Sequence, residues 1–571
     1  MVCYGCTIIN WGRCVLRCLA PTMAQIVAPT VTPTKEIFTV KHTLAARVGR
    51  FSAATLISRV LGYLRDASVA YVFGGGALTD SFYTAFRVSN LLRRLFGEGA
   101  MASSFVPIFS ESIKTKSKEE SQEFLNSMFS SLVSILLIVT VLGIIFAPFL
   151  MRLVAPGFAH DPVQFARTVN LTRWTFPFFL FICLAALLGS VLNSFKHFFV
   201  SAVAPAMLSV SEIFYLFALL PLLLVCVPGF DAEYQMLGLA ISAVLGGAGH
   251  FFVQVPQVYS SGYQLGWSWK WKHPDSLRVL SLMIPALIGS SADQINAFVD
   301  TICATTLATG SVTALYNSNR LMQFPLALFG VAISSVSLTT LSDFRAEKNY
   351  EQCAITLNQS LRLIIFTVLP ASIGLILLSH PICALLFEHG KFNNAATILT
   401  AQSLAAYAFG LIAYSAVKSL ANGFYAFQEP KVPVQIAGVC MVINIVLILL
   451  LRKPMGAAGL ALATAIAAWV NALWLFLIFR RKLRLLGTPA IEDAGNISLT
   501  KTIAKTALSG AAMAIYLRWI TLQHWPISIT VITGVLGGII IFTITAHFLK
   551  LPEIQSIKNI LTRLKTKNYA N

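Results

Sequence analysis

Charged residues are scarce in this chain. Only 11% of its 571 residues are Asp, Glu, Lys or Arg, whereas soluble domains carry about 25%. Hydrophobic residues make up 56% of the sequence, and the mean hydropathy is +0.74. This balance excludes an ordinary soluble domain and indicates an integral membrane protein.

Acidic residues are scarcer than basic ones. The chain has 23 Asp and Glu against 42 Lys and Arg, which gives a formal net charge of +19. A basic chain can bind nucleic acid, but these cations lie in loops and inside apolar segments rather than on a soluble domain. Loop cations that face anionic lipid explain them better, so we expect no nucleic-acid partner.

The sequence also lacks the motifs of catalysis and of tight metal binding. There is no Ser/His/Asp arrangement and no Walker sequence, since the glycines of "FGGG" at 73–76 are not followed by Gly-Lys-Ser/Thr. Cys3 and Cys6 form a CxxC pair, but Cys14 and Cys18 do not complete a usual zinc spacing. Nothing here indicates an enzyme.

Long apolar blocks, such as 131–150 and 529–548, are abundant. Each is close to the ~20 residues that cross a bilayer as a helix. About fourteen such segments predict an all-α polytopic membrane protein with two pseudo-symmetric six-helix lobes and two further C-terminal helices. The predicted parts are a tail without ordered structure at 1–43, an N-lobe at 44–258, a C-lobe at 276–480, the last two helices at 501–549 and a basic tail at 550–571.

Basic loop residues predict the orientation. Alternate loops are rich in Lys and Arg, including 114–118 and 480–484, and the C-terminal tail is basic as well. Such loops stay in the cytoplasm, and an even number of spans puts both termini there. Arg452 and Lys453 are exceptions on the other side.

A weak internal repeat supports the two lobes. "LFGEGAMASSFVP" begins at Leu95 and "LFGVAISSVSLTT" begins at Leu328; the same offset aligns Tyr83 with Tyr316 and Arg87 with Arg320. A duplicated helix bundle with its binding site between the halves is a recurring plan among transporters.

Several membrane-length segments hold charges that lipid does not tolerate. Each charge costs roughly 2.5–3.5 kcal/mol at the centre of a span, so the side chains must face protein or water. The first two segments contain Arg59, Arg65, Asp66, Asp80, Arg87, Arg93, Arg94 and Glu98, and the eighth contains Arg320. Some of these residues could be structural ion pairs, or a cytoplasmic flank in the case of Arg94. For Arg59, Arg65 and Arg320 we favour a cationic cavity, and a diphosphate suits it because guanidinium groups bind phosphate bidentately.

The seventh segment carries two acids, Asp293 and Asp300, on one helix face. A buried carboxylate needs a partner. One interpretation is a salt bridge to a cavity arginine; the other is a cation site at Asp300, with Asn444 and Thr464 as oxygen ligands.

The run from Ser58 to Glu111, "SRVLGYLRDASVAYVFGGG…SSFVPIFSE", resembles the MurJ (MviN) family, and the likeness covers about residues 44–550. The segments "APGF" at 155–158, "NRLMQFPLALFGVA" at 319–332, "GKF" at 390–392 and "NGFYAFQEPKVPV" at 422–434 fit the same family. The resemblance implies fourteen helices in the bacterial cytoplasmic membrane. It implies a flippase for lipid II, the undecaprenyl-diphosphate precursor of peptidoglycan, within the multidrug/oligosaccharidyl-lipid/polysaccharide exporter superfamily.

The resemblance also implies site residues. The positions similar to the family's cavity arginines and their acidic partners are Arg59, Arg65, Asp66, Asp80, Arg93, Glu98 and Arg320. Asn319 and Gln323 depart from the family by standing where other members carry acids. Asp300, Asn444 and Thr464 are similar to sodium ligands of some members, but Ile448 stands where another acid is expected.

Three functions are compared. The first is a lipid II flippase that works by alternating access, with lipid II, membrane lipids and proteins of cell-wall synthesis as expected partners. The alternative is another exporter of the superfamily, either a polysaccharide-lipid flippase or a cation-coupled drug antiporter; the antiporter predicts an acidic cavity, whereas this one is basic. A non-transport scaffold leaves the cost of the intramembrane arginines unexplained.

Overall fold

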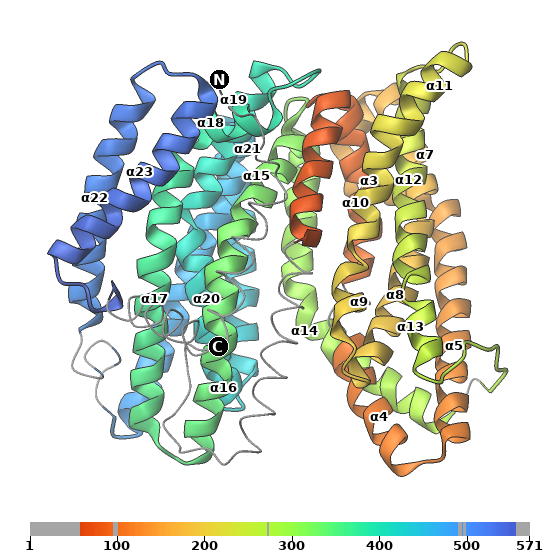
Figure 1. Cartoon of the computed structure of the whole chain (residues 1–571), viewed down its shortest axis with the longest axis horizontal. Helices are drawn as coiled ribbons and strands as arrows, with labels where there is room; N and C mark the ends of the chain where they lie inside the picture. The colour runs from red at the N-terminus through yellow and green to blue at the C-terminus, as the bar shows by residue number, and fades with distance from the viewer. Residues whose placement is uncertain are drawn as a thin grey trace, which may run out of the picture. The chain divides into compact units, whose positions relative to one another are not determined.

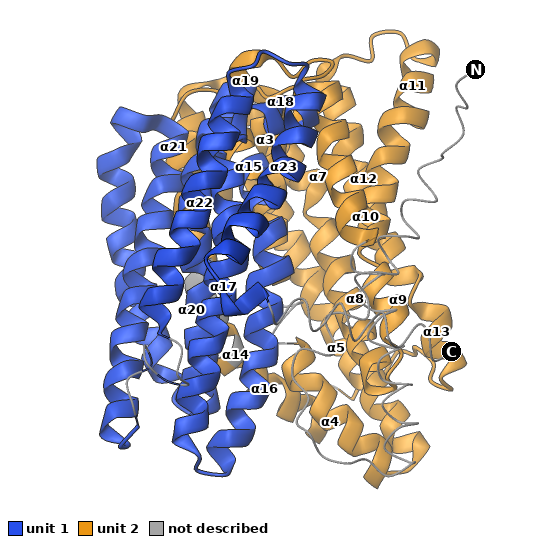
Figure 2. Ribbon diagram, turned by 60° about the vertical axis from the view of Figure 1, so that its left-hand side comes forward, with its two compact units in different colours: residues 1–53, 317–386, 397–571 blue, residues 54–316, 387–396 orange. Residues whose placement is uncertain are grey.

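The protein is helical throughout the part that the computed structural model describes, which is residues 57–94, 101–270, 273–488, 491, 494 and 498–554. No strand occurs in these ranges. The chain divides into two compact units (Figures 1 and 2): unit 1 comprises residues 1–53, 317–386 and 397–571, and unit 2 comprises residues 54–316 and 387–396. The two units are groups of residues in contact, whereas the two lobes were predicted from the internal repeat. The units therefore do not test the lobe boundaries, which stay a prediction.

Unit 2 holds the helices of the first half of the chain. They are a helix at 57–73, α3 (Ala77–Arg93), α4 (Met101–Thr115), α5 (Lys118–Ile145), α6 (Ala147–Val154), the short η2 (Pro156–His160), α7 (Pro162–Thr175), α8 (Pro177–Ser194), α9 (Phe198–Val203), α10 (Ala206–Phe214), η3 (Tyr215–Leu219), α11 (Leu220–Cys226), α12 (Ala232–Phe252), α13 (Val255–Ser260) and α14 (Pro274–Thr305).

Helix α15 (Ser311–Pro325) begins in unit 2 and continues into unit 1. The other helices of the second half are η4 (Leu326–Val331), α16 (Ala332–Ala346), α17 (Tyr350–Leu377), α18 (Ser379–Phe387), α19 (Asn394–Phe409), α20 (Leu411–Ala426), α21 (Lys431–Leu485), α22 (Leu499–Thr521) and α23 (Ile527–Phe548).

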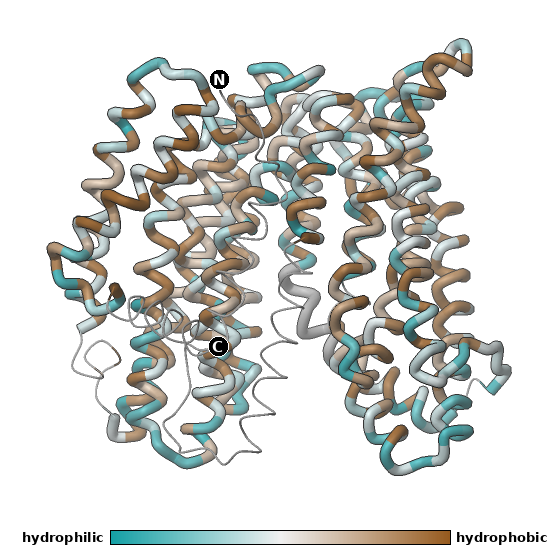
Figure 3. The backbone as a smooth tube through the Cα atoms, viewed as in Figure 1, coloured by the Kyte–Doolittle hydropathy of each residue, from teal (hydrophilic) through white to brown (hydrophobic). Residues whose placement is uncertain are grey.

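Many of these helices are long and apolar enough to span a membrane. Within the described ranges eight pass this test, or up to nine if the bent pair α19 and α20 is one span. Apolar residues dominate along the helices (Figure 3). The prediction of an all-α polytopic membrane protein is therefore confirmed, whereas the exact number of fourteen spans stays a prediction.

Local sequence signals explain where several helices begin. Helix α5 starts with a capping box: Glu120 N–H donates to Ser117 Oγ at 3.2 Å, and Ser117 N–H donates to the Glu120 carboxylate at 3.0 Å. The reciprocal bonds satisfy two backbone donors that a helix start otherwise leaves open. Asp231 caps α12, because its side chain accepts hydrogen bonds from the N–H groups of Glu233 and Tyr234.

Aromatic and aliphatic side chains from α3, α4, α5, α8, α12 and α14 form the core of unit 2. Its largest fully buried members are Phe105, Phe109, Phe124, Phe178 and Phe179. Ring contacts link them, with centroids 5.0 Å apart between Phe105 and Phe109. This packing gives the helices that carry the charged residues a rigid support.

The helix that carries Arg320 changes from α to π geometry after Pro325. Helix α15 ends at Pro325 and passes directly into the π-helical turn η4. Proline has no N–H to donate to the carbonyl of the preceding turn, so regular α geometry is interrupted there.

The two glycine-containing motifs "FGGG" and "GKF" pack against each other within unit 2. Lys391 N–H donates to the carbonyl of Tyr71 at 2.9 Å. Gly74 has φ +76°, and a Cβ on it would lie 2.6 Å from the Lys391 carbonyl oxygen. Gly74 therefore permits a close approach of the two backbones.

A buried ion pair fastens the end of the chain in unit 1. The Arg362 guanidinium on α17 donates to the Glu553 carboxylate just after α23, and both side chains are under 10% exposed. Phe366 and Phe542 pack beside this pair with ring centroids 5.4 Å apart. The last two helices are thus joined to α17 by charge and by apolar contact.

Candidate functional site

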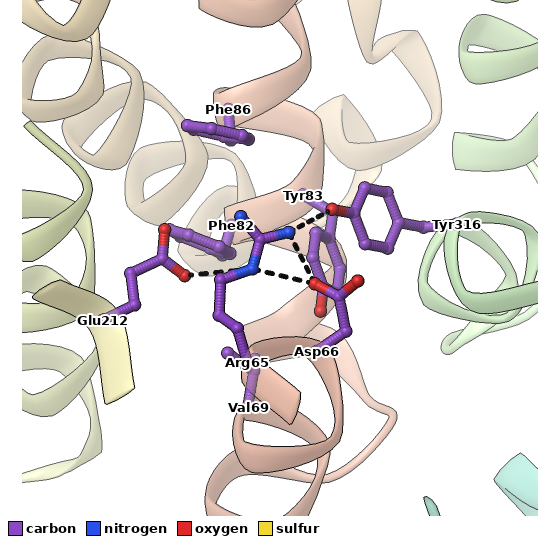
Figure 4. Close-up of a pocket in the computed structure, with 8 residues that line it drawn as sticks. All are labelled: Arg65, Asp66, Val69, Phe82, Tyr83, Phe86, Glu212 and Tyr316. Atoms are coloured by element: carbon purple, nitrogen blue, oxygen red, sulfur yellow. Dashed lines mark hydrogen bonds and ion pairs between the residues drawn. The ribbon is translucent and has the colours of Figure 1, made fainter. Parts of the chain in front are cut away.

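Arg65 is the centre of a buried charged cluster in unit 2 (Figure 4). Its guanidinium donates to Asp66 Oδ1 from Nε at 2.9 Å and from Nη2 at 2.6 Å. The same Nη2 donates to the Tyr316 hydroxyl at 3.0 Å. Arg65 is 5% exposed and Asp66 is 1% exposed. The sequence prediction that Asp66 partners a nearby arginine is therefore confirmed.

A second acid, Glu212, reaches the same guanidinium from α10. Its Oε2 lies 3.7 Å from Arg65 Nε, and its side chain is 2% exposed. The sequence analysis missed Glu212, although the cost argument applied to the arginines would have found it: it is an acid inside an apolar segment. It lies one turn before the π-helical turn η3, a geometry that often marks functional positions.

Aromatic rings close the cluster. Tyr83 on α3 stacks on Tyr316 of α15, with ring centroids 4.0 Å apart and planes 20° apart. Phe82 and Phe86, stacked at 5.9 Å, line the pocket beside the guanidinium (Figure 4). Tyr83 and Tyr316 are the positions that the internal repeat aligns, so two repeat-equivalent residues touch each other here.

Asp80 bonds to the start of α15, and its predicted part in substrate binding stays a prediction. Its carboxylate accepts bonds from Gly310 N–H at 2.6 Å, from Thr313 N–H at 2.8 Å and from the Thr313 hydroxyl at 2.6 Å. It therefore caps the start of α15 from α3, one helix away from the Arg65 guanidinium. Asp80 and Thr313 are 233 residues apart, the same offset that aligns Tyr83 with Tyr316.

Around Arg65, one cation meets two carboxylates in a setting from which water is largely excluded. Burying a single guanidinium without counter-ions is too costly for a stable protein, and two acids that share it keep it charged. The planar fork presents donors in fixed directions. The chemistry of the cluster would allow another anion to bind the Arg65 guanidinium in place of one of its two carboxylates.

The other predicted residues of the first half are more dispersed. Arg59 is exposed, six residues before Arg65 on the same helix. Arg93 Nε donates to Asn90 Oδ1 at 2.7 Å on its own helix, and Arg87 is partly buried. Glu98 lies outside the described residues. Of the predicted site residues in unit 2, Arg65 and Asp66 are held together by direct bonds.

Arg320 belongs to unit 1 and is partly buried on α15. Its neighbours Asn319 and Gln323 bond to each other, with Gln323 Nε2 donating to Asn319 Oδ1 at 2.5 Å. An amide pair thus occupies the two positions where acids were expected, and it carries no charge. That Arg320 faces the same cavity as Arg65 stays a prediction.

The sodium site also stays a prediction. Asp300 is near the end of α14 in unit 2, whereas Asn444 and Thr464 lie on α21 in unit 1. Asn444 is fully buried, and the Thr464 hydroxyl donates to its own helix at the Leu460 carbonyl, 3.1 Å away. Ile448 is fully buried and supplies no oxygen.

Comparison with known proteins gives a consistent result. The family model "Lipid II flippase MurJ" matches residues 69–536. A probable lipid II flippase MurJ of Vibrio cholerae is 35% identical over 504 residues, which is 85% of this chain and 92% of that protein. The lipid II flippase MurJ of Burkholderia cenocepacia is 35% identical over 435 residues, covering 76% of this chain and 83% of that protein.

Solved structures agree with the sequence relatives. A structure described as lipid II flippase MurJ in an inward closed conformation superposes with a TM-score of 0.74 at 28% identity, over 88% of this chain and 99% of its own. An inward-facing multidrug MATE transporter of the MOP superfamily gives 0.61 at 14% identity, over 83% of this chain and 98% of its own, which shows a shared fold.

The two acids around Arg65 should substitute for each other in part. Asp66→Asn or Glu212→Gln alone should cost about 1–3 kcal/mol of stability, because one carboxylate still faces the guanidinium. The double variant should cost more than the sum of the two, since the cation is then buried without a counter-ion. Thermal unfolding of the purified protein measures this, with the half-exposed Glu111→Gln as a control expected to change little. Strictly additive losses would contradict the shared role.

Proposed function

The chain belongs to the MurJ family of lipid II flippases, and from that membership we propose that it carries lipid II from the inner to the outer leaflet by alternating access. It is a multi-pass protein of the bacterial inner membrane. The alternative reading as a drug antiporter is set aside, because the sequence relatives are flippases and the MATE likeness extends to the fold alone.

The Arg65 cluster is the observation that carries the proposal. In lipid II a diphosphate links the polyprenyl tail to the sugar, and this diphosphate presents paired oxygens that match the guanidinium fork. In this structure the fork is occupied by Asp66 and approached by Glu212. We propose that the two carboxylates hold the arginine charged and oriented until the diphosphate replaces them.

This exchange suits a carrier. The protein must bind the headgroup on one side and release it on the other, so its cation must not hold the diphosphate too tightly. Acids that compete for the same guanidinium lower the net affinity and restore the empty site after release. The sugar and peptide follow the diphosphate while the polyprenyl tail stays in lipid.

Further parts of the proposal come from the sequence. Arg59, Arg93 and Arg320 would add cations along the path of the headgroup. Both termini would lie in the cytoplasm, because the basic loops lie on that side. Transport would involve no chemical step, so no enzymatic activity is proposed; membrane lipids and proteins of cell-wall synthesis are the remaining partners.

Arg65 and Arg320 are proposed to contact the diphosphate from the two halves of the chain. Replacing either by Ala should abolish complementation of a bacterium depleted of its own flippase, while the amount of protein in the membrane stays normal. Lys should rescue only partly, since it lacks the bidentate fork. Normal growth with both Ala variants would refute the proposal.

Sodium binding at Asp300, with Asn444 and Thr464 as further ligands, is proposed to bias the protein toward one orientation. With Ile448 in place of an acid, the site should be weak, because ligand charge tunes cation affinity. Asp300→Asn should therefore reduce sodium-dependent flipping in proteoliposomes more than it reduces headgroup binding. If the unmodified protein flips at equal rates in sodium and in an inert cation at fixed potential, Asp300 is a structural counter-ion instead.

A further inference from the structure

An extended segment between α13 and α14, residues 262–270, lies against the first three turns of α5 (Figure 1). Its backbone is bonded to side chains of that helix. Gln264 N–H donates to Gln122 at 2.9 Å, Gly266 N–H to Asn126 at 2.9 Å and Ser268 N–H to Ser130 at 2.8 Å. The Ser127 hydroxyl donates to the Lys270 carbonyl at 2.7 Å.

The spacing of these partners explains the fit. Gln122, Asn126 and Ser130 are four residues apart, so they form one polar stripe on α5. Alternate N–H groups of an extended chain point to the same side, and they meet this stripe one after another. At the start of the segment, the buried ring of Tyr263 packs on Phe109 at 5.6 Å and on Phe195 at 5.3 Å. The segment is therefore fixed rather than a loose loop.

Two large aromatic side chains remain exposed on this fixed segment. Trp267 is 50% exposed and Trp269 is 76% exposed. Their rings touch edge to face with centroids 5.6 Å apart. Exposing two adjacent indoles to water is unfavourable. Because the backbone holds them in this exposed position, we expect lipid or another protein to cover the two rings.

The position of the segment identifies that surrounding. Helix α5 is a candidate span that begins with charged residues at Lys118 and becomes apolar after its polar stripe. Ser130 is twelve residues from the start, or ~18 Å along the axis. The segment thus lies where the charged end of the span gives way to its apolar part, which is the depth of the lipid headgroups. Indoles favour this depth, since the ring is apolar and its N–H is polar.

Basic side chains accompany the two indoles. Lys118 Nζ would lie 3.2 Å from a Cβ on Gly262, so it lies directly over the segment. Lys270 is largely exposed and pairs with Glu123 at 2.7 Å. Lys116 bonds to Asp275 at 2.5 Å, in the first turn of α14. Lys116 and Lys118 lie at the charged end of α5, where cations suit the anionic headgroups of a cytoplasmic leaflet.

We propose that Trp267 and Trp269 form an interfacial anchor, seated among the headgroups of the leaflet on the basic side of the protein. The anchor fixes the segment that leads into α14, and so holds the start of that helix at a constant depth in the membrane. It involves neither Arg65 nor the proposed substrate, so it can hold or fail independently of the transported lipid. The competing occupant is a protein partner, which is one outcome of the test.

The test uses the full chain in nanodiscs made with lipid brominated either near the headgroup or near the chain end. The difference in tryptophan emission between the unmodified protein and the W267F/W269F variant isolates the two indoles. We expect at least twofold stronger quenching of this difference by the shallow bromines. Trp469 is the matched control, because it lies on α21 about 24 Å from the C-terminal end of that helix and is 38% exposed; the W469F difference should be quenched more by the deep bromines.

Weak quenching by both lipids, together with strong quenching by aqueous iodide, would overturn the anchor and leave a water-facing surface for a protein partner. Stronger quenching by the deep bromines would also overturn it, because the rings would then lie in hydrocarbon. If the double variant does not fold, the single W269F variant gives the same comparison, since Trp269 is the more exposed of the two.

Discussion

The burial of the Arg65 guanidinium is the constraint on which the site depends. A cation at membrane depth without counter-ions would destabilise the fold by several kcal/mol. The protein meets this cost with Asp66 from the same helix, Glu212 from α10 and the hydroxyl of Tyr316 from α15. The helix at 57–73, α10 and α15 are thereby joined at the Arg65 guanidinium. The proposed function uses this arrangement as an anion receptor, in which each carboxylate would be exchanged for a substrate oxygen.

The internal repeat explains why α3 and α15 meet as they do. Asp80 bonds to Thr313 and Tyr83 stacks on Tyr316, and both pairs join positions that the repeat makes equivalent. Contacts between equivalent residues are what a near two-fold relation produces, since each side then offers its counterpart the same surface. The two pairs differ in kind. Asp80 meets a threonine, whereas Tyr83 meets a second tyrosine.

Much of this could be predicted from the sequence because the cost of charge in lipid is large and local. The all-α membrane fold follows from apolar length, and the Arg65–Asp66 pair follows from adjacent charges in one span. Glu212 could have been found by the same cost argument, because it is an acid inside an apolar segment, but only the packing of α10 against the first helix reveals that Arg65 is its partner. The bonds of Asp80 to Gly310 and Thr313 could not be predicted, because they depend on a turn geometry that composition does not show. The position of the extended segment 262–270 could not be predicted either. It depends on which of its residues pair with which residues of α5, and local propensity does not determine that pairing.

The central claim is that Arg65 exchanges protein carboxylates for the diphosphate of the substrate. An experimental structure of the protein with lipid II bound tests it most directly. The account predicts a phosphate oxygen within about 3 Å of the Arg65 guanidinium, the usual length of a charge-assisted hydrogen bond, with Glu212 moved out of ion-pair range. A bound headgroup elsewhere, with Arg65 still bonded to Asp66 and beside Glu212 as it is now, would contradict the account.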